Sequence, residues 1–168
     1  MRTLFTVAAV VVAVVGCGDS LSPGDKPGTG NVTATGAVNA SGSGIAMFQS
    51  VSSGGSNLFQ ILVAPLSQTA APSWQIQIVS YSGRLAAGTY ALAPLSASST
   101  DPTASLYVTT AGTMEMFNSS SGELVITSSS STAVRGTFTF TAANVSGVGT
   151  VTARGAFNAQ CAPGIACN

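Results

Sequence analysis

A regular alternation of apolar and polar residues runs from Gly122 to Phe157, and it constrains the fold more than any other feature of the chain. One parity is apolar or small, with Leu124, Phe138 and Val151 among its members, whereas the other parity is polar. Alternation with a period of two is typical of strands with one buried and one solvated face. The stretch predicts a C-terminal three-strand meander with strands at Glu123–Thr127, Val134–Ala142 and Gly149–Asn158.

The parity also predicts which residues face each other across the meander. If the polar loops keep the apolar residues together, Phe138 pairs with Ala153, and Gly136 falls opposite Gly155. Two facing glycines leave a dent in the buried face. We expect a large aromatic side chain such as Trp74 to fill it.

The rest of the chain shows more short strand-like segments and no sustained helical period. Strands are predicted at Leu58–Ala64 and Trp74–Tyr81, with a hairpin formed by Leu106–Thr110 and Thr113–Phe117. A turn is predicted at Asn118–Ser121, before the meander. The fold class is therefore all-β, a single antiparallel β-sandwich or barrel-like domain of about nine or ten strands. The spacing of the strands does not distinguish a sandwich from a barrel.

Composition limits the partners of this chain of 168 residues. Charged residues make up 6% of the chain and hydrophobic residues 45%, so a packed core is expected under a surface of Ser, Thr, Asn and Gln. Such a surface suits an extracytoplasmic β-protein. The formal net charge is zero and no basic patch occurs, which argues against nucleic acid as a partner.

The N-terminus has the features of an export signal. Arg2 precedes the apolar run Leu4–Val15, which is too short to cross a bilayer core of about 30 Å and suits a signal peptide. The run ends in Val14-Val15-Gly16-Cys17, which resembles the lipobox of bacterial lipoproteins. The resemblance implies a lipid on the sulfur of Cys17, cleavage before it and a membrane anchor in the bacterial envelope. Gly18 after the cysteine favours the outer membrane by the same resemblance. An ordinary secretory peptide is the alternative.

Three regions follow from these observations. We expect a signal peptide over 1–16, a lipidated Cys17 with a flexible linker over 17–30, and a β-sandwich domain over 31–168. The body contains four short motifs: Gly88–Tyr90, Gly122–Thr127, Gly136–Phe140 and Gly155–Phe157. In these motifs it resembles uncharacterised β-domain lipoproteins of environmental bacteria. That resemblance implies no function.

The chain has three cysteines. If Cys17 carries lipid, Cys161 and Cys167 remain as a pair in an oxidising compartment, with a Pro163-Gly164 turn between them. A structural disulfide is the favoured interpretation. A zinc site would need further ligands, and a redox-active pair is more typically Cys-x-x-Cys beside a helix.

The sequence contains few residues that indicate a catalytic site. Histidine is absent, which removes the commonest general base. Glu115 and Glu123 are expected near each other across the predicted turn, but more simply as two solvated side chains. We expect a polar cluster of Glu123, Arg135 and Arg154 on the solvent-exposed face. Surface ion pairs of this kind usually contribute little to stability. We expect no enzyme activity, no metal and no cofactor.

Three functions remain open. The first is a non-enzymatic, membrane-anchored domain with a binding or structural role in the envelope. The second is a carrier of a small apolar ligand in a barrel cavity, as in lipocalin-like lipoproteins. A cavity lined by Phe59, Trp74, Phe138 and Phe140 would favour that carrier. The third is a carboxylate-dependent hydrolase.

Overall fold

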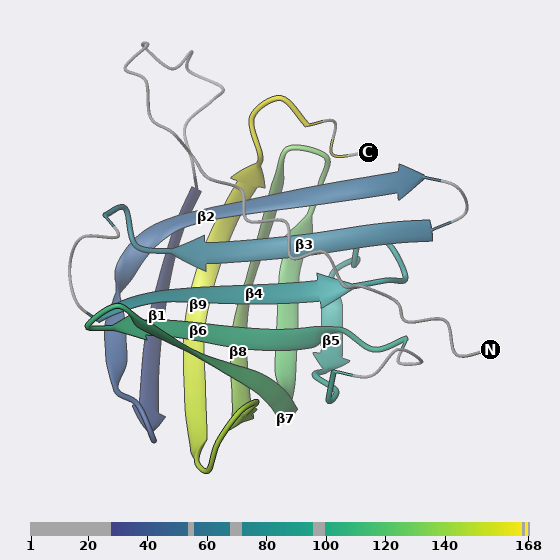
Figure 1. Cartoon of the computed structure of the whole chain (residues 1–168). Helices are drawn as coiled ribbons and strands as arrows, with labels where there is room; N and C mark the ends of the chain where they lie inside the picture. Colours follow the sequence, from purple (N-terminus) through teal and green to yellow (C-terminus); the bar gives the residue numbers. More distant parts are fainter. Residues whose placement is uncertain (1–27, 54–55, 68–71, 96–99, 166, 168) are drawn as a thin grey trace.

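A computed structural model describes residues 28–53, 56–67, 72–95, 100–165 and 167. These residues form nine β-strands and no helix (Figure 1). The strands are β1 Gly28–Gly36, β2 Ala40–Ser53, β3 Ser56–Ala64, β4 Ser73–Ser80, β5 Gly88–Ala91, β6 Thr103–Thr110, β7 Thr113–Ser129, β8 Ala133–Asn144 and β9 Thr150–Cys161.

Eight of these strands close into an antiparallel barrel. The sheet runs β7-β6-β4-β3-β2-β1-β9-β8, and β8 pairs again with β7. The first strand, β1, therefore pairs with the last, β9, and this pairing completes the circuit. Strand β5 lies outside it and pairs with β7. The all-β, barrel-like prediction is confirmed, and the closed barrel is the architecture found.

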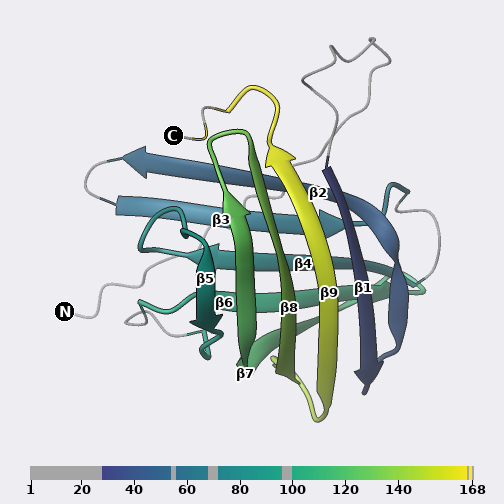
Figure 2. The ribbon, with the colours of Figure 1, turned by 180° about the vertical axis from the view of Figure 1, so that it is seen from behind.

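Two long strands carry the sheet around the corners of the barrel. In β2, residues Ala40–Ala46 pair with β1, and residues Ile45–Ser53 pair with β3. In β7, the first part pairs with β6 and the longer second part with β8. As a result, β2, β3, β4 and β6 cross behind β1, β9, β8 and β7 when seen in Figure 2. Sheets that share bent strands in this way enclose one core between crossed layers.

Side chains fill the space between the layers. Phe48 and Phe59 meet at a ring-centroid distance of 6.1 Å, and Phe138 and Phe140 at 5.9 Å. An eight-stranded barrel has an interior just wide enough for its own side chains to fill. The largest fully buried side chains are Phe48, Phe59, Phe117, Phe138, Phe140, Ile61, Ile76, Ile78, Leu106, Leu124, Ile126 and Val63.

The predicted register of the meander is wrong by two residues. Phe138 lies opposite Gly155, not Ala153, and Gly136 lies opposite Phe157. A shift of two keeps every side chain on its predicted face, because the side-chain period of a strand is two. Each glycine is covered by the phenylalanine across from it, so that a Cβ at Gly155 would lie 2.5 Å from Phe138 Cζ.

Trp74 does not fill this dent. Its indole lies over a different glycine, with Nε1 3.3 Å from where a Cβ on Gly42 would be.

The turn predicted at Asn118–Ser121 is also absent. Strand β7 continues through these residues from Thr113 to Ser129, with a register irregularity between Ser119 and Ser121. Residues of odd number face the core before the irregularity, as Phe117 does, and residues of even number after it, as Leu124 does. A β-bulge produces this change of parity by inserting one unpaired residue.

Strand β1 likewise differs from expectation at its start. It begins at Gly28, so Gly28–Gly30 pair with β2 and β9 instead of belonging to the predicted linker.

Candidate functional site

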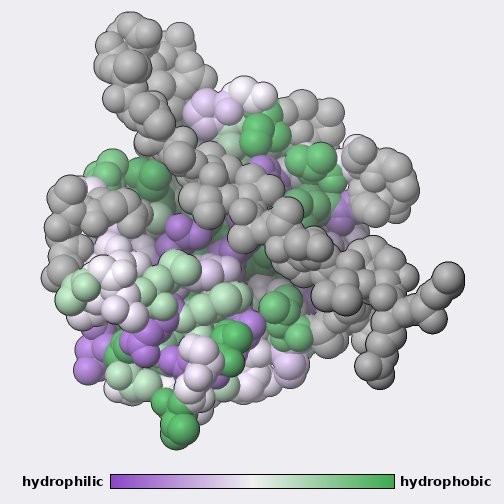
Figure 3. All heavy atoms as spheres, in the orientation of Figure 1, coloured by the Kyte–Doolittle hydropathy of each residue, from purple (hydrophilic) through white to green (hydrophobic). Residues whose placement is uncertain are grey.

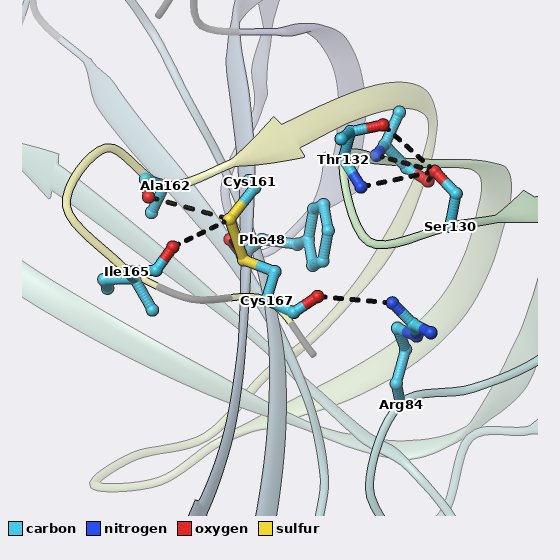
Figure 4. Close-up of a disulfide and its surroundings, with 9 residues drawn as sticks. Phe48, Arg84, Ser130, Thr132, Cys161, Ala162, Ile165 and Cys167 are labelled. Carbon is cyan, nitrogen blue, oxygen red and sulfur yellow. Dashed lines mark hydrogen bonds between the residues drawn. A yellow bond between two sulfur atoms is a disulfide. The ribbon is translucent and has the colours of Figure 1, made fainter.

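The C-terminal tail is fastened to the barrel by a disulfide between Cys161 and Cys167, with an S–S distance of 2.11 Å and a Cα–Cα distance of 6.0 Å (Figure 4). This is the pair that the cysteine count predicts. Strand β9 ends by pairing in parallel with β2, where Cys161 lies opposite Phe48. The Ala162 N–H then donates to the Phe48 carbonyl at 2.9 Å.

The tail covers one end of the barrel. Cys167 is 4% exposed and belongs to the hydrophobic core, and Ile165 packs against that core. Arg84 Nη1 donates a hydrogen bond to the Cys167 carbonyl at 3.3 Å (Figure 4). No local pattern indicates this contact, because its two residues are 83 positions apart in the chain. The disulfide therefore holds a small apolar cover in place.

Loss of the disulfide is expected to weaken the fold moderately. The bond closes a short loop, for which the chain-entropy estimate is about 2 kcal/mol. Cys161→Ser/Cys167→Ser should therefore lower the free energy of unfolding in urea by about this amount. The intact mass of the wild-type chain should rise by two hydrogens on reduction. Two alkylatable thiols at these positions in the unreduced, folded protein would contradict the assignment.

The three charged residues of the predicted polar cluster lie on the outer face but not in contact with one another. Thr139 pairs with Glu123 on one side and with Arg154 on the other. Glu123 and Arg154 are thus two strand spacings apart, about 10 Å. Arg135 lies farther along β8, and its Nε donates to Asn158 Oδ1 at 3.1 Å. No ion pair joins the three among the described residues.

The two carboxylates considered for hydrolysis are not brought together. Glu115 and Glu123 are eight residues apart on the same strand, β7, which rises about 3.3 Å per residue. Glu115 instead accepts a hydrogen bond from Asn144 Nδ2 at 3.3 Å. The expected proximity across a turn is therefore wrong, since the turn does not exist.

The aromatic residues do not form one binding face. Trp74 is 4% exposed and points into the core, whereas Tyr81 is 59% exposed. Tyr107 lies on the outer face, where its hydroxyl donates to Gln77 Oε1 at 3.2 Å and burial raises its pKa. The Tyr90 hydroxyl donates to the Ala86 carbonyl at 2.9 Å. On the face seen in Figure 3, hydrophilic and hydrophobic residues are interspersed.

A hollow of about 190 Å³ opens on the outer face between β1 and β9. It is lined by Thr33, Thr35, Thr152 and Arg154. Strand pairing sets these residues side by side, because Thr33 lies opposite Arg154 and Thr35 opposite Thr152. Sequence reasoning missed the hollow. The alternation of the meander places Thr152 and Arg154 on its polar face, but nothing local indicates that the first strand pairs with the last.

The predicted lipid anchor cannot be followed in the structure, because Cys17 and the segment before it lie outside the described residues. Within the described ranges, no three His, Cys, Asp or Glu side chains gather as a metal site would require. The same ranges contain no helix with the length and hydropathy needed to span a bilayer.

The fold and surface define a class: a closed, eight-stranded antiparallel β-barrel with one added strand, a side-chain-filled interior and a disulfide-fastened tail. Comparisons with models of protein families, with curated proteins and with solved structures gave no significant match.

Proposed function

We propose that this chain is a lipid-anchored, extracytoplasmic lipoprotein of the bacterial envelope whose barrel acts through its outer surface, by binding or by a structural role, and not by catalysis. The observation that carries the proposal is the interior. Phe59, Phe138 and Phe140 occupy it at 0%, 2% and 1% exposure, and Trp74 at 4%. A barrel filled by its own side chains leaves the outside as the surface available to a partner.

Two further observations support the location. A disulfide is typical of proteins that fold in an oxidising compartment, and Cys161–Cys167 is present here. The lipobox-like end of the apolar run, Val14–Cys17, supplies the anchor in this proposal. A single acyl chain gives only reversible binding, so durable anchoring needs more than one chain.

The anchor is tested by expressing the full chain in a bacterial host with a fatty-acid analogue. The wild type should carry the label and fractionate with membranes. Cys17→Ser should lose the label completely, because no sulfur remains at that position to acylate. Cys161→Ser/Cys167→Ser is the matched control and should keep the label. Equal labelling of wild type and Cys17→Ser would disprove the anchor.

A carrier of a small apolar ligand is the second candidate, because eight strands also suffice to hold one small ligand. It would require the phenylalanines of the core to move aside. Titration of the full chain with a fluorescent fatty acid, followed by quenching of the single tryptophan, Trp74, separates the two functions. Saturable quenching at a one-to-one ratio would favour the carrier. Unchanged Trp74 fluorescence would favour a protein that acts through its outer surface.

A further inference from the structure

The outer face of β1, β9, β8 and β7 is rich in short polar side chains. These four strands lie side by side in Figure 2. Their register sets outward residues in rows across the sheet, one of which runs Thr33–Arg154–Thr139–Glu123. Neighbours along a row are about 4.8 Å apart, and rows are about 6.7 Å apart. The face is thus a regular array of hydroxyl groups with few charges.

The Thr33–Thr35–Thr152–Arg154 hollow lies within this array. Its volume is about 190 Å³ and it is open to solvent, so a group bound there would stay partly exposed. Its three hydroxyl groups can both donate and accept hydrogen bonds, and the threonine methyl groups offer small apolar contacts. This combination matches the ring of a sugar, which presents hydroxyl groups on its rim and C–H groups on its faces.

The positive charge of Arg154 favours a ligand that carries a negative charge. Its guanidinium can only donate, and it fits a carboxylate through two parallel hydrogen bonds. Among the described residues, no hydrogen bond or ion pair engages this side chain, and Glu123 is two strands away. Arg135, the other arginine of the face, already donates to Asn158. Arg154 is therefore the cation available to an external carboxylate.

From these contacts we propose that the hollow binds a carboxylate-bearing sugar unit of an acidic polysaccharide. Arg154 holds the carboxylate, Thr33, Thr35 and Thr152 contact the ring hydroxyls, and the neighbouring threonine rows contact adjacent units of the chain. One exposed site of this kind binds weakly. Successive units on one face raise the overall affinity through effective concentration. This inference rests on the surface-binding role proposed above and names its ligand class.

The test uses the full chain purified in mild detergent, with binding followed by calorimetry. The probes are an oligomer of glucuronic acid, a glucose oligomer of equal length and inorganic phosphate. The glucuronic acid oligomer should bind, and the other two should bind at least tenfold more weakly. Arg154→Gln should weaken binding of the acidic oligomer about tenfold or more, because a charge-assisted pair is lost. Thr152→Val should weaken it less.

Arg135→Gln is the matched control, since it removes the same charge from the same face outside the hollow, and it should change the affinity less than about twofold. Equal losses in both arginine variants would mean diffuse charge attraction and would overturn the site. Equal binding of glucose or of phosphate would overturn the ligand class. Fatty-acid labelling of the same samples keeps the two proposals apart. A labelled chain that binds no sugar refutes only this inference, and an unlabelled chain that binds refutes only the anchor.

Discussion

Phe138→Ala is expected to lower the free energy of unfolding by about 3–5 kcal/mol, enough to remove a large share of the stability of a domain of this size. Phe138 is 2% exposed, contacts Phe140 at a centroid distance of 5.9 Å and covers Gly155 on the neighbouring strand. Truncation would leave a cavity over a residue that has no side chain to fill it. Urea denaturation of the full chain, followed by Trp74 fluorescence, measures the loss.

Thr139→Ala is the matched control for this experiment. Thr139 is the next residue on β8, points outward and is exposed. Its truncation should change the free energy of unfolding by no more than about 0.5 kcal/mol, as surface substitutions usually do. A Phe138→Ala chain that unfolds at the same urea concentration as wild type would show that the buried face has been assigned to the wrong parity.

Gly155→Ala is expected to destabilise the barrel by about 3 kcal/mol, the upper end of typical overpacking. An added Cβ would collide with the backbone carbonyl of Asn31 on β1 and would lie 2.5 Å from Phe138 Cζ. The phenyl ring is buried and the carbonyl belongs to the partner strand, so neither moves freely. Strands β1 and β9 would have to separate at the seam where the barrel closes.

Gly147→Ala, in the loop between β8 and β9, controls for the glycine change itself. Its Cβ would meet nothing nearer than Asn144 Oδ1 at 3.6 Å, an ordinary contact distance. Thermal unfolding of the two variants should differ by well over 5 °C. If both unfolded at the wild-type temperature, the close approach of β1 to β9 would be disproved.

The parts of the fold that the sequence predicted depend on local patterns. The alternation around Phe138 identified the strands and the buried face correctly, because a strand's two faces are fixed by residue parity alone. The exact partner of Phe138 was wrong, since register depends on how many residues the loop between β8 and β9 consumes. A register shift of two residues keeps every side chain on the same face, so the apolar–polar alternation does not reveal it.

The predicted turn at Asn118–Ser121 failed for a different reason. Asn and Ser favour turns, but that preference is weak, and pairing with a neighbouring strand overrides it. Here β8 pairs with Asn118, Ser119 and Ser121, β6 pairs with Asn118 alone, and the irregularity around Ser120 reverses the parity. The change of parity resembled the end of one strand and the start of another.

The candidate site was predictable only in part. The cysteine pair followed from counting, whereas the hollow depends on a pairing between residues such as Thr33 and Arg154, more than 100 positions apart. Long-range pairing of this kind has no signal in a single sequence, because neither strand is distinguished locally from its alternatives.

The seam between β1 and β9 also governs the order in which the barrel can form. Every other strand of the circuit pairs with a strand close to it in the chain, so most of the sheet can assemble progressively as the chain emerges. Strand β1 must wait for the last strand to arrive, with one edge unpaired in the meantime. Contacts between distant residues form slowly, and an unpaired edge invites pairing with another chain. Closing this seam is therefore expected to limit the folding rate, and a chain that ends before β9 would keep an open edge on which copies can aggregate.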